Sequence, residues 1–586
     1  MEKNTVLAVV LSSIVLIAFF AIQNALTPPP SPVIQPEQSG VVATDSFAEE
    51  SIQIEQPVSP SPAFNAVFID EEAVNAELIT IQTEVVTVVL TNAGGDMVSW
   101  KLKSHLDHDE NVDMIFSGDK DAHAFSIAFG GMDTLPVSSL FHVNRISEHT
   151  VEFYRDFSVP GTDTKFRLLK RYDFKPNDYM FELTVTLEGD SNVPGFNFSG
   201  DAYTLAFGPQ IGPKFEKLNV RYDYRQYHVY TNGKRRSAKV NNVIDTRPTW
   251  AAISGKYFTF IAIPHLAQFS AVFTETREPG IPSASRLSII RPAVNQRTVT
   301  DTYKFYLGPK SEGVLKVYHS GLNDFKFKES SLTEMASSRG VLAPLEIGLK
   351  WLLLLCYKIV PNYGVAIILL TLMIKIVFFP LTKKSSEATS RMQELAPKIK
   401  EIQEKYKGNP QKLNAEMATF YQKEGYNPIS GCLPMLLQIP IFIAMYNLFN
   451  NHFDLRGASF IPGWIPDLSV PEYIVNFPDG FQVPILGWTA LRALPFIYVG
   501  SQLMYGKITQ APGQQTAGQM KMMLYIMPIA FFFILYNVPS GLLLYWIFSN
   551  AFTLVQQVII NKYKKSKAPP PDAPPQYVVA PKKKKR

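Results

Sequence analysis

The chain has 586 residues, of which 46% are hydrophobic and 18% charged, and its mean hydropathy is +0.02. This composition excludes a disordered, collagenous or coiled-coil protein. The net charge of +5 is the sum of two unlike parts, because residues 23–343 carry a net charge of −8 and the remainder carries +13. Such asymmetry indicates that the basic part contacts a membrane or a nucleic acid.

The N-terminal segment is the first candidate for a membrane span. Residues 5–22 form an uncharged apolar run of about 18 residues, which is long enough to cross a bilayer. The run is either a cleaved signal peptide or a retained anchor, and the poor cleavage site after Gln23 favours an anchor over residues 1–24. Residues 25–75 follow as a linker rich in Pro, Ser and Gln.

Residues 76–330 are predicted to form a large external β-sandwich. Polar and apolar residues alternate there, and short strand-like runs are separated by turn signals such as Asn232-Gly233. The region holds eight of the nine histidines, but it contains neither an HExxH nor a GxSxG motif. We therefore expect no enzymatic activity, no metal and no cofactor. The strand-like runs include residues 85–90, 151–154, 181–187 and 258–263.

The C-terminal half is predicted to be an α-helical membrane core. Residues 331–361 are a linker plus an amphipathic helix that lies in the membrane interface, because residues 344–360 contain three charges. Residues 362–381 form the second span, and residues 432–560 contain spans three to six. The apolar runs within this last region are 432–449, 483–505, 522–536 and 541–560.

Charge distribution orients these six spans. The loop 382–431 and the tail 561–586 are rich in lysine, whereas the loop 450–482 has one basic residue. The positive-inside rule places both basic segments and both termini in the cytoplasm, with the acidic β-sandwich outside. The loop 382–431 has the pattern of a helical hairpin, which is either a solvated topogenic loop or a surface that docks a partner or gates a cavity.

Lys375 is the most informative residue, because it lies within the second predicted span. A lysine near the middle of a span costs about 2.5–3.5 kcal/mol to insert, so it usually faces water or serves a function. The alternative is that its side chain extends to the inner headgroups, about 9 Å away at Leu381. Thr371 shares its helix face, and other spans carry uncharged polar residues but no carboxylate. This pattern indicates a water-filled cavity instead of a proton relay.

Four motifs in this half resemble the YidC/Oxa/Alb family of membrane protein insertases. They match in order and spacing over about residues 341–563, and the N-terminal anchor with a large external domain resembles the Gram-negative type. A weaker resemblance surrounds Gly94-Gly95-Asp96. The motifs are residues 371–382 (TLMIKIVFFPLT), 427–434 (NPISGCLP), 438–442 (QIPIF) and 539–546 (PSGLLLYW).

The resemblance implies a five-helix core that encloses a hydrophilic groove, open to the cytoplasm and to lipid but closed outside. The positive charge in the groove would attract acidic or polar parts of a nascent protein. Lys375 stands where most relatives carry arginine, so the charge is kept but the bidentate fork is lost. The external domain would resemble a sugar-mutarotase-like sandwich without the enzyme's activity. The implied substrate-groove residues are Lys375, Thr371, Gln438, Phe442 and Tyr545.

The resemblance also implies partners and a location. The partners are nascent membrane proteins, the Sec translocon (SecYEG and SecDF), the ribosome and signal recognition particle pathway, and membrane lipids. The location is the bacterial inner membrane, with the large domain periplasmic. Hairpin docking would use Lys383, Lys384, Arg391, Lys398 and Lys405, and ribosome contact would use Lys582, Lys583, Lys584, Lys585 and Arg586, unless this tail is only topogenic.

Two other functional classes remain open on the residues alone. An anion-binding solute transporter would use Lys375 as its binding charge, although no internal repeat is visible between the spans. An anchored carbohydrate-binding or carbohydrate-modifying protein would use the β-sandwich. The leading hypothesis is an insertase and chaperone that folds nascent inner-membrane proteins, alone or with the Sec translocon.

Overall fold

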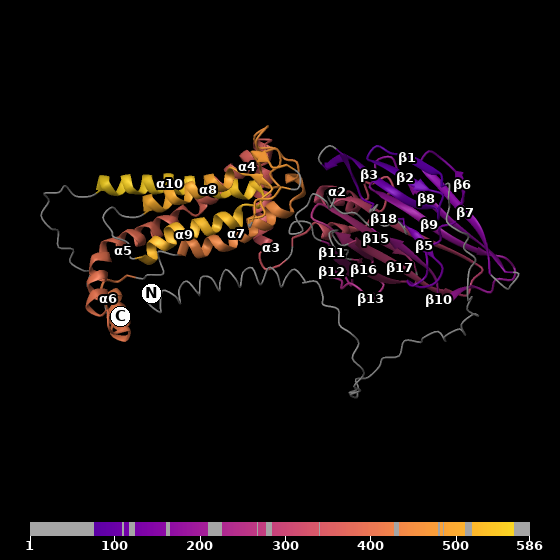
Figure 1. The fold of residues 1–586 in the computed structure, drawn as a ribbon, viewed down its shortest axis with the longest axis horizontal. Helices are drawn as coiled ribbons and strands as arrows, with labels where there is room; N and C mark the ends of the chain where they lie inside the picture. Colours follow the sequence, from indigo (N-terminus) through magenta and orange to yellow (C-terminus); the bar gives the residue numbers. More distant parts are fainter. Residues whose placement is uncertain are drawn as a thin grey trace, which may run out of the picture. The chain divides into compact units, whose positions relative to one another are not determined.

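The computed structural model describes most of residues 76–567 (Figure 1). The predicted anchor, the linker and the basic tail from residue 568 onward lie outside the described residues. Shorter stretches that are also outside are residues 108–109, 116–122, 160–163, 209–224, 267, 277–283, 339, 427–432, 479–480, 485 and 510–517.

The β-domain contains three antiparallel sheets, which confirms the predicted all-β sandwich. The largest has the strand order β12-β11-β14-β15-β18-β9-β8-β7-β6, the second β13-β16-β17-β10-β5, and the third β1-β2-β3-β4. The strands are β1 (Leu78–Gln82), β2 (Val86–Thr91), β3 (Asp96–Asp107), β4 (Glu110–Asp113), β5 (Ser126–Ala128), β6 (His142–Arg145), β7 (Thr150–Ser158), β8 (Lys165–Phe174), β9 (Met180–Gly189), β10 (Phe196–Phe207), β11 (Gln226–Thr231), β12 (Lys234–Ser237), β13 (Val243–Ile244), β14 (Trp250–Ser254), β15 (Phe258–His265), β16 (Ser270–Thr276), β17 (Ala284–Val294) and β18 (Thr298–Pro309).

Alternating side chains build the core between the sheets. Along β8 every second residue is buried, as the two-residue period predicts. The central ring is Phe125, which contacts Phe181, Phe207 and Phe305 with ring centroids 4.7–5.1 Å apart. β14 is buried throughout, because a second cluster containing Trp250 packs beneath helix α2 (Glu312–Ser320) and the 3-10 helix η2 (Ser330–Met335).

A charged pair lies inside this core. Lys170, on β8, is fully buried, and its Nζ donates to Asp96 Oδ1 at 2.5 Å, to the carbonyl of Gly94 at 3.0 Å and to the carbonyl of Phe125 at 2.9 Å. Burial raises the pKa of Asp96 and lowers the pKa of Lys170, while their mutual attraction opposes both shifts. Gly94 and Gly95 adopt φ of +68° and +62°, so their turn suits glycine and brings the carbonyl of Gly94 to the ammonium.

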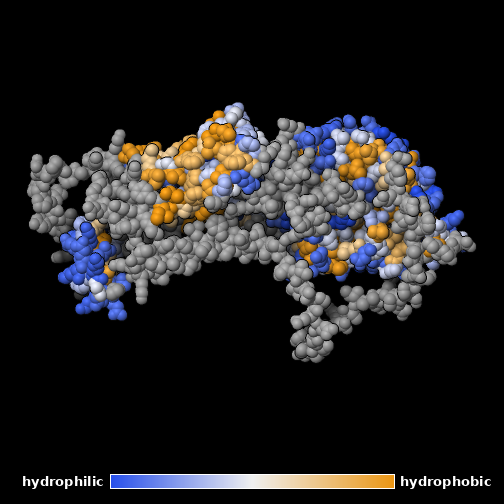
Figure 2. Space-filling view, viewed as in Figure 1, coloured by the Kyte–Doolittle hydropathy of each residue, from blue (hydrophilic) through white to orange (hydrophobic). Residues whose placement is uncertain are grey.

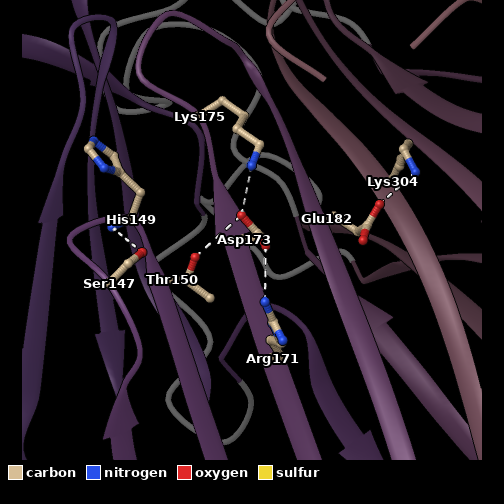
Figure 3. A network of polar contacts seen from close by, with 8 residues as sticks. All are labelled: Ser147, His149, Thr150, Arg171, Asp173, Lys175, Glu182 and Lys304. Atoms are coloured by element: carbon tan, nitrogen blue, oxygen red, sulfur yellow. Dashed lines mark hydrogen bonds and ion pairs between the residues drawn. The ribbon is translucent and has the colours of Figure 1, made fainter. Parts of the chain in front are cut away.

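A second group of charges lies on the surface of the same sheet (Figure 3). Asp173 accepts a hydrogen bond from Lys175 at 3.1 Å and forms an ion pair with Arg171 at 3.6 Å. One strand further on, Glu182 accepts from Lys304 at 2.6 Å. Only Glu182 and Lys304 face each other across two strands, β9 and β18, whereas Asp173 pairs with residues two positions away along the chain. All of these side chains are partly exposed, so each pair stabilises the sheet by at most about 1 kcal/mol.

The helical part follows the β-domain, and helix α10 packs against α4 and α8 (Figure 1). Among the described residues, one helical segment, Ser540–Ile560, is long and apolar enough by itself to cross a membrane. The pair Tyr363–Val377 and Phe379–Ala388 also qualifies if it is one broken span, and the count of six spans stays a prediction. The helices are α3 (Ala343–Ile359), α4 (Tyr363–Val377), α5 (Phe379–Lys405), α6 (Pro410–Lys423), α7 (Leu433–Asn451), α8 (Leu494–Thr509), α9 (Gly518–Leu535) and α10 (Ser540–Lys567), with a short η4 (Phe453–Leu455) and the two-residue strands β19 (Val475–Asn476) and β20 (Ala490–Leu491).

Two element boundaries differ from those predicted. The second span does not end in a loop, because α4 continues into α5 through a bend of 61° at Phe378. Pro380 has no N–H to offer the carbonyl of Ile376, so the regular helical ladder breaks there. The apolar run 483–505 is helical only from Leu494, since Gly487 has a φ of +63° and β20 pairs with β19.

Gly364, in the first turn of α4, packs directly beneath Phe460. A Cβ at this position would lie 2.0 Å from Phe460 Cδ2 and 2.6 Å from Phe460 Cβ. We expect Gly364→Ala to lower the melting temperature of the detergent-purified protein. The added methyl group forces the loop that carries Phe460 to move or to become strained, which costs about 1–3 kcal/mol of stability. Gly348→Ala, where the added Cβ meets nothing within 4 Å, is the matched control and should not lower it. Equal melting temperatures for the two variants would refute this contact.

Candidate functional site

Lys375 lies in the last turn of α4, just before the bend. Its side chain is half-buried, and among the described residues its ammonium has no hydrogen-bond or ion-pair partner. Helix α10 packs against α4, and the surfaces of α10 and α8 are hydrophobic in Figure 2, as expected of helices that face lipid. Exposed apolar residues on these helices include Ile497, Met504, Val555 and Ile559. An unpaired cation beside such a surface is costly, and therefore it is a candidate binding charge.

Polar side chains on other helices converge on α10. Gln438, on α7, donates its Nε2 to the hydroxyl of Tyr545 at 2.6 Å. Asn550 donates to Ser501 Oγ, on α8, at 2.9 Å. Tyr545 is 1% exposed, so the hydrogen bond between Gln438 and Tyr545 is shielded from solvent in the structure. Two of the predicted groove residues, Gln438 and Tyr545, are thus in direct contact.

Aromatic residues continue this contact between α7 and α10. Phe442, one turn after Gln438, stacks on Trp546 with ring centroids 4.7 Å apart and an angle of 11° between the rings. Tyr498, on α8, approaches the same indole at 5.4 Å. The i,i+4 spacing of Gln438 and Phe442 places both side chains on the face of α7 that meets α10.

Thr371 occupies a different environment from the other predicted groove residues. It is fully buried, and its hydroxyl donates to the carbonyl of Ile367 in its own helix at 2.7 Å. This i−4 bond satisfies the hydroxyl within α4. Any contact of Thr371 with a substrate therefore requires the side chains that bury it to move, and its hydroxyl would then act as an acceptor.

Two further polar residues of α10 were not singled out from the sequence. Gln556 donates its Nε2 to the backbone carbonyl of Lys375 at 3.2 Å, and Gln557 accepts from Ser386 Oγ, on α5, at 2.9 Å. A periodic signal was available for Gln556. Tyr545, Ser549 and Gln556 follow the 3.6-residue period, so they share one face of α10.

The hairpin of α5 and α6 carries the predicted docking residues, and Figure 2 shows a hydrophilic surface over α6. Arg391 donates to the carbonyl of Glu424 at 2.7 Å, and Lys398 pairs with its carboxylate at 3.1 Å. These two cations therefore join the helices as well as facing solvent. The side chains of all five predicted residues, Lys383, Lys384, Arg391, Lys398 and Lys405, are exposed.

The described residues offer little for metal chemistry. In this part of the chain no group of three or more His, Cys, Asp or Glu residues could hold a metal ion. Cys356 is buried against Met373, and Cys432 lies outside the described residues. The described residues of the site offer electrostatic attraction by Lys375, hydrogen bonding by Gln438 and Tyr545, and apolar contact by Phe442.

An apolar helical part with polar groups between its helices, joined to a large β-sandwich, defines a membrane protein with a large globular β-domain. The family model described as 60Kd inner membrane protein matches residues 355–567, and the model described as YidC periplasmic domain matches residues 78–326. The chain belongs to the YidC family of membrane protein insertases.

Individual relatives match almost the whole chain. The membrane protein insertase YidC of Treponema denticola is 46% identical over 96% of this chain and 100% of its own length. That of Treponema pallidum is 38% identical over 96% of this chain and 99% of its own length. A crystal structure of an active YidC insertase with its first transmembrane domain resolved is 16% identical, with a TM-score of 0.35, and covers 85% of this chain and 94% of that chain.

Proposed function

We propose that this protein inserts nascent proteins into the bacterial inner membrane through a groove in which Lys375 is the attracting charge. The observation that carries the proposal is the half-buried ammonium of Lys375, which has no polar partner among the described residues. Membership of the YidC family supports the insertase activity. The groove residues would be Lys375, Thr371, Gln438, Phe442 and Tyr545.

The physical task is to move a hydrophilic segment across an apolar layer about 30 Å thick. A wet groove that enters from the cytoplasmic side shortens the dry part of this path and lowers the desolvation barrier. Lys375 would attract acidic or polar residues of the segment, and the aromatic rings of Phe442 and Tyr545 would provide a surface along which it moves. The substrate's apolar helix would then leave laterally into lipid, where its burial supplies the free energy.

A lysine suits transient binding better than tight binding. Its ammonium is a compact point charge on a flexible stem, whereas arginine offers a planar fork that holds a carboxylate with two hydrogen bonds. Release of the substrate is part of each insertion cycle, so the weaker geometry of Lys375 is compatible with turnover. The same reversible contacts would let the protein act as a chaperone that folds membrane proteins.

The proposed orientation follows from the distribution of basic residues. Both termini and the hairpin of α5 and α6 would lie in the cytoplasm, and the β-domain would lie in the periplasm. The exposed cations of the hairpin, Lys383, Lys384, Arg391, Lys398 and Lys405, would dock partners. These partners would be the ribosome and signal recognition particle pathway and the Sec translocon. The tail residues Lys582 to Arg586 would add a contact to ribosomal RNA phosphates.

Site-specific crosslinking tests the groove directly. A photoreactive amino acid at position 375 or 545 is expected to crosslink to a ribosome-stalled nascent membrane protein in native membranes. Val555 is on α10 with a side chain 56% exposed on the apolar surface, so the same probe at this position should crosslink mainly to lipid. Equal crosslinking of the nascent chain from positions 375, 545 and 555 would argue against a defined groove.

A further inference from the structure

The bend between α4 and α5 leaves backbone carbonyls beside Lys375 in need of new donors. In a straight helix the carbonyl of Ile376 accepts from the residue at position 380, which here is a proline without an N–H. Lys375 lies one residue earlier, and its carbonyl accepts from Gln556 Nε2 at 3.2 Å. A side chain of α10 therefore caps the end of α4 at the residue that carries the groove charge.

The next residue of α10 contacts the other side of the bend. Gln557 Oε1 accepts from Ser386 Oγ at 2.9 Å, and Ser386 is 8% exposed in the second turn of α5. Consecutive residues of a helix point about 100° apart, so Gln556 and Gln557 contact two different helices, α4 and α5. One pair of adjacent amides thus holds α4 on one side of Phe378 and α5 on the other.

Both glutamines lie at positions where an apolar side chain would cost less free energy. Their neighbours Val555, Val558 and Ile559 are 43–56% exposed and form part of the apolar surface of α10. A polar group in such a helix costs free energy unless it is hydrogen-bonded. Gln556 Oε1 is buried and has no hydrogen-bond partner among the described residues, so this amide is only half satisfied. Packing alone does not account for two glutamines at these positions.

We propose that Gln556 and Gln557 are positioning residues that set the angle of the α4–α5 bend. Gln556 would fix where Lys375 stands in the groove, and Gln557 would fix the direction in which the α5–α6 hairpin leaves it. The two glutamines would thus connect the proposed docking surface of the α5–α6 hairpin to the ammonium of Lys375 through a single turn of α10. The functional part of this proposal rests on the proposed insertase groove, whereas its geometric part does not.

Distances between spin labels test the geometric part in the full-length protein, reconstituted in liposomes. Spin labels are attached to cysteines introduced at Leu372 on α4 and Lys400 on α5. The native Cys356 and Cys432 are replaced by serine. Pulsed electron paramagnetic resonance then measures the distance between the two labels, which reports the angle of the bend. We expect Gln556→Leu and Gln557→Leu to broaden or shift the distance distribution. Val558→Leu, on the apolar surface one residue away, should leave it unchanged. Ser386→Ala removes one hydroxyl with little risk to folding and should reproduce the effect of Gln557→Leu.

Insertion of a small single-span membrane protein into the same liposomes tests the functional part. Losing one hydrogen bond is expected to slow insertion about fivefold in Gln557→Leu, with no further loss when Ser386→Ala is added. Distance distributions that match the wild type in Gln556→Leu, Gln557→Leu and Ser386→Ala would overturn the proposal. Altered distances with normal insertion would overturn the link to the groove. If Lys375→Ala inserts normally, the proposed groove fails, and the distance measurement still decides whether the glutamines hold the bend.

Discussion

Replacing Lys375 by alanine is expected to reduce insertion at least about tenfold, whereas Lys375→Arg retains most of it. Two unit charges about 4 Å apart attract by about 4 kcal/mol at the effective dielectric constant of a partly buried site. A fraction of this, about 1.4 kcal/mol in the rate-limiting step, already gives a factor of ten. Arginine keeps the charge and adds donors, so its variant should bind acidic segments at least as well.

The measurement is insertion of a small membrane protein after depletion of the wild-type protein, with each variant supplied in its place. The loss in Lys375→Ala should be largest for substrates whose translocated segment is acidic. Lys358→Ala is the charge-matched control, because Lys358 is exposed at the end of α3, away from the proposed groove. Equal activity of the wild type and Lys375→Ala would remove this residue from the mechanism.

Replacing Lys170 by methionine is expected to destabilise the β-domain by about 3–5 kcal/mol at neutral pH. The change leaves the carboxylate of Asp96 buried without its cation, and the carbonyls of Gly94 and Phe125 lose their donor. Burial already raises the pKa of Asp96, and the attraction of Lys170 that opposes this rise is lost in the variant. A carboxyl with a raised folded-state pKa becomes less destabilising as the pH falls. The deficit should therefore shrink from neutral pH toward about pH 4, the unfolded pKa.

Rates of limited proteolysis of the β-domain in the full-length protein, measured from pH 4 to pH 7, test this expectation. Lys304→Met is the control, since it breaks the partly exposed pair with Glu182 seen in Figure 3 and should cost at most about 1 kcal/mol. Adding Asp96→Leu to Lys170→Met should recover part of the stability, because no charge then remains unpaired. A Lys170→Met variant as stable as Lys304→Met would show that the buried pair contributes little.

Local patterns predicted much of the fold. The two-residue period predicted β7, β9 and β15, and Asn232-Gly233 predicted the hairpin of β11 and β12, since both residues adopt positive φ there. The order of strands in the sheets was not predictable in this way. β18 pairs with β9 although more than 100 residues separate them, and no local signal specifies such a pairing.

The candidate site was predictable to a similar extent. Lys375 stood out because a charge in an apolar run is rare, and family motifs indicated Gln438 and Tyr545. The hydrogen bond between the last two joins residues 107 positions apart, so only the packed helices reveal it. The sequence did not indicate that Lys170 is buried, because a lysine on an alternating strand cannot be distinguished there from an exposed charge. Its acceptors at Gly94, Asp96 and Phe125 are distant in the sequence and are identified only in the structure. The helical period placed Gln556 on the same face of α10 as Tyr545, but the contacts of Gln556 and Gln557 with the two sides of the bend at Phe378 are visible only in the packed helices.

The position of β18 has a consequence for the order in which the β-domain is made. Within the nine-stranded sheet, β18 lies between β15 and β9, so it alone joins the group β12-β11-β14-β15 to the group β9-β8-β7-β6. It is also the last strand of the domain to be synthesised. Each group can form its own hairpins as the chain emerges, but both keep an open edge until Thr298–Pro309 arrives. The nine-stranded sheet closes only after nearly all of the domain has been synthesised, when just α2 and η2 remain before α3 begins the helical part.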